Sequence, residues 1–219
     1  MRLILYIGIL FSAVSCGRNC PELQSGDLLF QAEKGSDMAG AITAATGAVG
    51  TGNYTHVGIL VVGDHTGQRE NAAGYKADSV IEATDGGVRI VALADFLADA
   101  GKIDGHPAVT VLRLRDTTGV AAAVRRARSF LGLPYDYSFR PDNGKLYCSE
   151  LVWECYRAAD GSRLFSARPM NFRAADGTIP PFWRELFARL GESIPEGIPG
   201  TNPNDMARDT LLVEIGRWY

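Results

Sequence analysis

Short apolar runs that are rich in β-branched residues dominate the first half of the chain and predict β-strands. Gly, Asp and Asn bound these runs, as is typical of turns between strands. The predicted strands cover residues 26–31, 54–62, 79–84, 88–91 and 108–114. Because Asp85-Gly86-Gly87 separates two of them, we expect 79–84 and 88–91 to form an antiparallel hairpin.

Apolar residues that recur every three to four positions predict helices, most clearly over residues 118–131. Weaker helical patterns occur at 38–45, 92–100 and 181–190, residues 203–207 resemble a single capped turn, and 211–215 is predicted as a last strand. We therefore expect one α+β domain over residues 26–219, in which helices pack against an antiparallel sheet.

A further helix is predicted around residues 146–156, directly after a loop rich in Pro, Gly, Asn and Asp. Leu151, Val152, Cys155 and Tyr156 share one face of this helix, and we expect Glu150, Glu154 and Arg157 to face solvent. Cys148 and Cys155 lie two turns apart, about 10 Å, and cannot form a disulfide.

Cys148 falls in the first turn of this helix. Unpaired N–H groups and the helix dipole stabilise a thiolate at such a position, which makes Cys148 a candidate nucleophile. A small buried hydrophobic residue is the alternative interpretation of the same cysteine.

Residues 1–15 have the pattern of a signal peptide. A basic residue precedes an apolar run too short to cross a bilayer, and small residues then lead to Cys16. This resembles a bacterial lipoprotein signal, although Ala13 stands where that motif prefers leucine. We expect lipidation of Cys16, a tether over 16–25 and a membrane contact through the lipid; cleavage near Ser15 without lipidation is the alternative. Either reading predicts an exported protein, and the lipid anchor places it in the cell envelope, on a bacterial membrane and facing the periplasm or the exterior.

Charge and composition exclude several classes of function. The net charge of −3 and the pI near 5.6 give no basic footprint for nucleic acid. His56 and Cys148 are the obvious metal-ligand types, while His65 and His106 lie in turn-like loops without metal-site spacing. We therefore expect neither a metal nor another cofactor.

His56, Glu82 and Cys148 together have the chemistry of a thiol hydrolase. An imidazole activates the thiol and later protonates the leaving amine, and a carboxylate on the other ring nitrogen fixes the tautomer. Backbone N–H groups at the helix start form part of an oxyanion hole, which Tyr54 is a candidate to complete. Ser149 and Tyr135 are further candidates for oxyanion or substrate binding; a role for Tyr135, with the adjacent aspartate, in shaping the loop below the cysteine is the alternative.

The chain resembles a known family through five segments that occur in the family's order. They are Gly26-Asp27-Leu28-Leu29-Phe30, Thr55-His56-Val57-Gly58-Ile59, Val80-Ile81-Glu82-Ala83, Leu133-Pro134-Tyr135-Asp136-Tyr137 and Tyr147-Cys148-Ser149-Glu150-Leu151-Val152. The family is that of the YiiX/YebB-like cysteine hydrolases in the NlpC-type superfamily. Its papain-like fold is circularly permuted, so that the histidine strand precedes the cysteine helix, as also in lecithin:retinol acyltransferase-like proteins.

The resemblance implies that Cys148 is the nucleophile, His56 the base and Glu82 the third polar residue. Hydrogen bonding to a turn is the alternative role for Glu82. The implied activity is cleavage of an amide bond, in a cell-wall peptide or an isopeptide-like substrate. Two other functions stay open: acyl transfer to a lipid or amine by the same Cys–His pair, and non-catalytic binding in the envelope.

Overall fold

The computed structural model describes residues 22–32, 35–47, 53–63 and 78–219. The expected signal peptide, Cys16, most of the tether and His65 therefore lie outside the described residues. Within the described part of the chain, no helix has both the length and the apolar character needed to cross a membrane.

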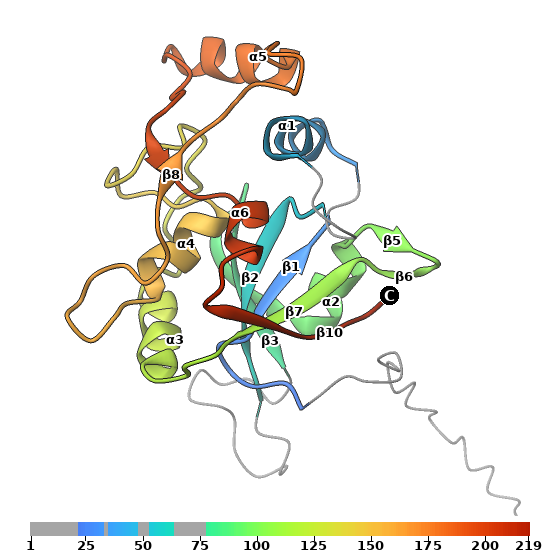
Figure 1. Cartoon of the computed structure of the whole chain (residues 1–219), viewed down its shortest axis with the longest axis vertical. Coiled ribbons are helices and arrows are strands. Elements are labelled where there is room, and N and C mark those ends of the chain that lie inside the picture. Colours follow the sequence, from blue (N-terminus) through green and yellow to red (C-terminus); the bar gives the residue numbers. More distant parts are fainter. Residues whose placement is uncertain (1–21, 33–34, 48–52, 64–77) are drawn as a thin grey trace, which may run out of the picture.

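The centre of the fold is a six-stranded antiparallel sheet with the strand order β10-β7-β1-β2-β3-β4 (Figure 1). Its strands are β1 (Leu28–Gln31), β2 (His56–Val61), β3 (Ser79–Thr84), β4 (Gly87–Ala92), β7 (Val109–Leu114) and β10 (Leu212–Arg217). The Asp-Gly-Gly turn joins β3 to β4 as a hairpin, as predicted, with Thr84 opposite Gly87. Two small ladders that the sequence pattern did not indicate are β5 (Lys102–Ile103) with β6 (His106–Pro107), and β8 (Arg168–Pro169) with β9 (Pro199–Gly200).

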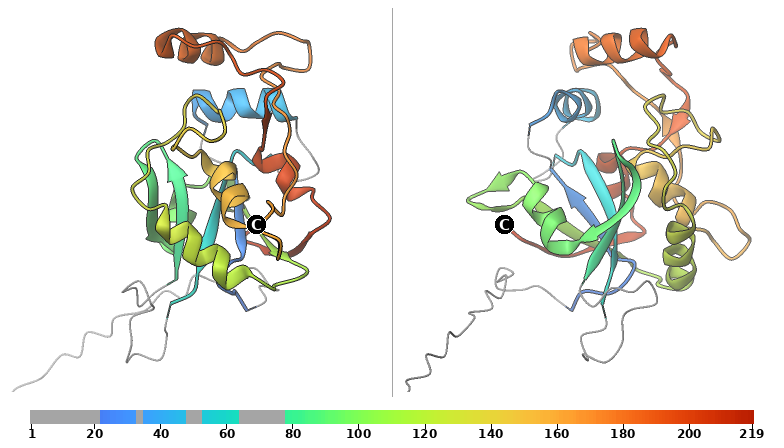
Figure 2. Two further views of the ribbon diagram at one scale, coloured as in Figure 1. Left: turned by 90° about the vertical axis from the view of Figure 1, so that its left-hand side faces the viewer. Right: turned by 180° about the vertical axis from the view of Figure 1, so that it is seen from behind.

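Helices cover both faces of the sheet and extend beyond one end of it (Figure 2). They are α1 (Asp37–Thr46), α2 (Leu93–Asp99), α3 (Val120–Ser129), α4 (Cys148–Cys155), α5 (Pro181–Leu190) and α6 (Pro203–Ala207). On one face, Leu60 and Val80 pack with Phe96 of α2. On the other face, Ile59 and Ile81 pack with α3 and α4. Neighbouring residues of a strand point to opposite faces of the sheet, so these contacts show which face each residue of β2 and β3 occupies.

The largest difference between predicted and observed bounds concerns α3. The helix was expected over residues 118–131 but covers Val120–Ser129. Gly119, with φ of 85°, is left-handed and cannot belong to the helix. The last strand, β10, continues two residues beyond the predicted end, to Arg217.

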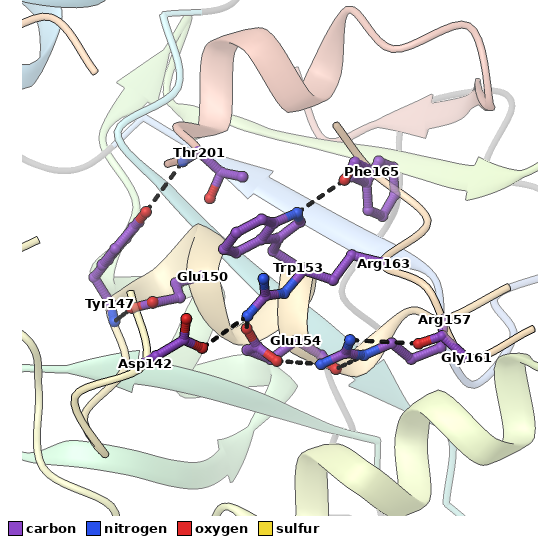
Figure 3. A network of polar contacts seen from close by, with 10 residues as sticks. All are labelled: Asp142, Tyr147, Glu150, Trp153, Glu154, Arg157, Gly161, Arg163, Phe165 and Thr201. Atoms are coloured by element: carbon purple, nitrogen blue, oxygen red, sulfur yellow. Dashed lines mark hydrogen bonds and ion pairs between the residues drawn. The ribbon is translucent and has the colours of Figure 1, made fainter. Parts of the chain in front are cut away.

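A polar network covers the side of α4 that faces away from the sheet (Figure 3). Trp153 Nε1 donates to the carbonyl of Phe165 at 2.8 Å, and the Arg163 guanidinium lies 3.8 Å from the centre of the Trp153 ring. Glu154 forms ion pairs with Arg157 and Arg163. The segment that follows the helix thus folds back over it, and α4 is enclosed from both sides.

The prediction that Glu150 faces solvent is wrong. Its exposed fraction is 1%, and Oε2 accepts a hydrogen bond from the N–H of Tyr147 at 3.4 Å. Burial, together with the negative charge of Asp136, raises the pKa of the Glu150 carboxyl to about 8. Helical periodicity identified the apolar face of α4, but the enclosure of the opposite face depends on segments distant in sequence.

Candidate active site

The sheet opens between β2 and β3 at the end that carries His56 and Glu82. The two strands pair from Ile59 to Val61 and from Ser79 to Ile81, and the pairing stops there. On the outer sides, β1 pairs with β2 as far as His56, and β3 pairs with β4 as far as Thr84. His56 and Glu82 therefore lie on firmly paired strands that border an open fork.

The structure brings His56, Glu82 and Cys148 together at this fork. His56 Nε2 lies 2.7 Å from Glu82 Oε2, and a side-chain hydrogen bond joins His56 to Cys148. Because Nε2 is directed at the carboxylate, Nδ1 is the ring nitrogen left for the sulfur. The ring of Phe96 packs against the imidazole, with centroids 5.8 Å apart.

The electrostatics of the group favour a charged imidazole. Burial would lower the pKa of His56, but the hydrogen bonds and charges of Cys148 and Glu82 outweigh it and raise the pKa to about 10. Burial would raise the pKa of the Glu82 carboxyl, but His56 and then Arg89 outweigh it, so this pKa is lowered. His56 therefore holds a proton, and Glu82 a negative charge, in neutral solution.

Cys148 is the first residue of α4 and therefore lies at the positive end of the helix dipole. Its exposed fraction is 5%, and it borders two clefts. Cys155, on the same helix, has an exposed fraction of 0%, and burial raises the pKa of its thiol to about 12. Of these two free cysteines, only Cys148 combines access to a cleft with a basic partner.

The two clefts differ in size and in chemistry. One has a volume of about 250 Å³ and a wall of aromatic side chains that includes Phe139, Phe172 and Trp183. The other has a volume of about 610 Å³. It is lined by His56 and by a set of charged side chains: Glu82, Asp85, Asp99, Arg89 and Arg189. Ile42 of α1, Tyr135 and Cys148 line both, so these three residues mark the boundary between the clefts.

The other residues predicted near the cysteine, Tyr135, Ser149 and Asp136, differ in their access to the clefts. Tyr135 and Cys148 both line the two clefts, and the Tyr135 hydroxyl donates to Met38 Sδ at 4.0 Å. Ser149 is fully buried, and its hydroxyl accepts a hydrogen bond from Thr201 at 3.1 Å. Asp136 accepts bonds from Ser138 and from the next turn of the loop, which fits the loop-shaping role.

Tyr54 does not take the position expected of an oxyanion donor. Its hydroxyl donates to Thr110 Oγ1 at 2.9 Å, and its ring packs on Phe30, toward β1 and β7 and away from the fork. The strand begins at His56 rather than at Tyr54, so the alternation that would put both side chains on one face does not apply.

Arg89 contacts the site and was not identified from the sequence. Its Nε and Nη2 lie 2.9 Å and 2.8 Å from Glu82 Oε1. A signal was present, because a two-residue turn that pairs Thr84 with Gly87 necessarily sets Glu82 opposite Arg89.

Known proteins resemble this chain in sequence and in fold. YiiX of Escherichia coli (strain K12) is 30% identical over 174 residues, which cover 78% of this chain and 75% of YiiX. A crystal structure described as metalloprotein yiiX from Escherichia coli O157:H7 superposes with a TM-score of 0.67 at 26% identity, covering 89% of this chain and 97% of that one. Among the described residues here, no three His, Cys, Asp or Glu side chains are grouped so as to hold a metal ion, so they do not fit a metal site.

A family model also matches, over residues 22–216, and its description is that of a permuted papain-like amidase enzyme. Histidine strand, carboxylate strand and cysteine helix follow one another in the permuted order, which confirms the predicted fold. The chain belongs to the permuted papain-like amidases of the YaeF/YiiX, C92 family.

Proposed function

We propose that the protein is a thiol amidase of the cell envelope, with Cys148 as nucleophile, His56 as acid and base, and Glu82 as the group that orients His56. The observation that carries this proposal is the continuous chain of contacts from Glu82 through His56 to Cys148, at the boundary of two clefts. A buried structural cysteine would need neither a basic partner nor access to a cleft.

In the acylation step, the Cys148 thiolate attacks the carbonyl carbon of the amide. The tetrahedral intermediate then expels the amine, which takes a proton from Nδ1 of His56, and a thioester remains on Cys148. In the second step a water molecule gives a proton to Nδ1 and attacks the thioester. The products are a carboxylic acid and the free thiolate beside a protonated imidazole.

The charge on the carbonyl oxygen would be stabilised at the start of α4. The first N–H groups of a helix have no partner within the helix, and Cys148 and Ser149 supply two of them. Tyr135 lines both clefts and is the candidate to add a hydroxyl donor, which would exchange its weak contact with Met38 Sδ for the carbonyl oxygen.

The position of His56 determines which end of the substrate occupies which cleft. The group that protonates the leaving amine must lie on the amine's side of the scissile bond. His56 lines the larger, charged cleft and does not line the aromatic one. The amine therefore belongs in the charged cleft, and the acyl group in the cleft walled by Phe139, Phe172 and Trp183.

We further propose that the substrate is a peptide or other amide of the cell wall, and that a lipid on Cys16 holds the protein at the membrane. The signal-like segment that ends in Cys16 supports export and anchoring. Labelling of cells with a fatty-acid probe tests the anchor: a labelled wild-type protein and an unlabelled Cys16→Ser variant are expected, and equal labelling of both would refute it.

Covalent trapping tests the amidase proposal itself. The full-length protein is mixed with cell-wall digests, quenched in acid and mapped by mass spectrometry for a thioester on the peptide that contains Cys148. We expect an acyl adduct on Cys148 that is absent from Cys148→Ala and retained in Cys155→Ala. Turnover of a fragment by Cys148→Ala would exclude the proposed mechanism.

Acyl transfer is the second candidate function, and the aromatic cleft favours it. A thioester whose acyl chain lies against the aromatic wall of this cleft, which has a volume of about 250 Å³, is shielded from water on one side, which gives an amine acceptor an advantage. Adding an amine to a reaction that forms the thioester separates the two functions. Free acid as the main product indicates a hydrolase, and a new amide indicates a transferase.

A further inference from the structure

The side chain of Arg89 meets Glu82 from the neighbouring strand, at the edge of the sheet. Glu82 and Arg89 are direct cross-strand partners in the β3–β4 hairpin. Two nitrogens of the guanidinium converge on a single carboxylate oxygen, Oε1, at 2.9 Å and 2.8 Å. The other oxygen, Oε2, is the one that bonds His56 at 2.7 Å. Each oxygen of the carboxylate therefore has its own partner.

We propose that Arg89 is a positioning residue that holds the Glu82 carboxylate so that Oε2 points at His56. This inference rests on the proposed function, because it gives Arg89 its effect through the proposed acid and base. A carboxylate on a flexible glutamate side chain can rotate, and a donor on only one oxygen would leave that rotation free. A planar guanidinium that donates its Nε–H to the opposite oxygen and holds Nη2 2.8 Å from the same oxygen restricts this rotation.

The exposure of the three side chains fits this division of roles. Side-chain exposure is 6% for His56 and 5% for Glu82, but 45% for Arg89. A buried carboxylate is costly to keep charged without a cation nearby. Arg89 supplies that cation from the rim and leaves the interior to the imidazole and the carboxylate. Because His56 also pairs with Glu82, the carboxylate has a positive group on each side.

Other titratable groups near the fork also influence how the reactivity of Cys148 depends on pH. His56 faces Cys148 of α4, Glu82 of β3 and the apolar ring of Phe96 of α2. The remaining titratable or charged side chains that line the same cleft are Asp85, Asp99, Tyr135, Tyr137 and Arg189. Arg89, which lines this cleft as well, contacts Glu82 directly.

The test measures the rate of iodoacetamide alkylation of Cys148 from acid to neutral pH, read by peptide mapping. This reaction needs no amide substrate, so it stays informative whether or not the protein hydrolyses one. In Arg89→Met we expect the acid-side midpoint of the alkylation profile to rise by about one pH unit, a roughly tenfold slower reaction at a fixed acidic pH. Arg89→Lys keeps the charge but loses the planar guanidinium, so we expect it to restore only a minor part of the midpoint. Full recovery in Arg89→Lys would show that charge, and not positioning, carries the effect.

Two controls separate positioning from a general effect on the sheet. Arg217→Met removes an arginine from the opposite edge strand, where it pairs with Glu214 at 2.6 Å, and should leave the profile unchanged. In a Glu82→Gln background, Arg89→Met should add no further shift, because both changes act on one interaction. A wild-type profile in Arg89→Met, or the same shift with and without Glu82, would overturn the inference. Absence of amide cleavage by the wild-type protein would refute the amidase and leave this result standing.

Discussion

The carboxylate of Glu82 lies 2.7 Å from Nε2 of His56, on the side of the ring opposite to the nitrogen that faces Cys148. The imidazole is thus held between an acid and a thiol that come from a strand and a helix 66 positions apart in the chain. This geometry determines what each substitution in the site should do.

Removing the sulfur or the imidazole should abolish amide cleavage. We expect Cys148→Ala and His56→Ala to lose activity by a factor of at least about 10³, because no nucleophile or proton donor replaces them. Circular dichroism and a melting curve should show that both variants fold. Cys155→Ala, which truncates a buried cysteine on the same helix, serves as the matched control and should retain turnover.

Glu82→Gln should reduce activity without eliminating it. The amide keeps the shape of the carboxylate but loses the charge that stabilises the imidazolium, so the loss should fall mainly on kcat, by roughly 10² to 10⁴. Steady-state kinetics, measured on a fragment identified by the trapping experiment, shows whether kcat or KM changes. A change confined to KM would instead indicate that Glu82 contacts the substrate.

The pH dependence of activity and stability should follow the protonation of His56. Its pKa is raised from 6.5 to about 10 on folding. A pKa that is higher in the folded than in the unfolded state stabilises the fold fully below about pH 6.5, and this contribution disappears as the pH rises through 10. The basic limb of kcat/KM should lie near pH 10, because the leaving amine needs the ring proton. A basic limb near pH 6.5 would show that the pKa of His56 is not raised and would contradict the ion pair of His56 with Glu82.

Glu150→Gln should stabilise the protein at alkaline pH. The pKa of Glu150 is raised from 4.5 to about 8, so between these pH values the unfolded chain releases a proton that the native protein retains, and the stability falls. The contribution of the protonated Glu150 carboxyl to stability is therefore complete below about pH 4.5 and is lost as the pH rises to about 8. Melting temperatures of the two proteins should agree at pH 4.5 and diverge in favour of the variant at pH 9.

The exposed Glu185 on α5 provides the control for this comparison. Glu185→Gln should change the melting temperature little at either pH, since a carboxyl that stays in water loses no solvation on folding. Equal effects of both substitutions would mean that net charge, rather than burial, governs the alkaline stability.

The sequence predicted the strands and the location of Cys148 because both depend on local patterns. β-Branched runs and the Asp-Gly-Gly turn set β3 and β4, and the change from a Pro/Gly-rich loop to helical periodicity set the start of α4. The pairing of His56 with Cys148 was predicted from the chemistry that a thiol and a base have together and from the resemblance to a family, since periodicity alone relates no strand to a distant helix.

The errors share a different cause. Glu150 is buried, with Asp136 and Arg163 from two other segments as charged neighbours, and nothing in the helix pattern indicates those segments. Tyr54 turns away because β2 begins two residues later than its sequence suggests. Arg89 was within reach of sequence reasoning, because the hairpin register that pairs it with Glu82 follows from the turn.

The fork between β2 and β3 connects the hydrophobic core to the candidate site. The last residues that pair across the fork, Ile59 and Ile81, are fully buried, and His56 and Glu82 follow three positions and one position beyond them. The packing of two isoleucines therefore borders the backbone that carries the imidazole and the carboxylate. Core substitutions there belong to the same structural unit as the proposed acid and base.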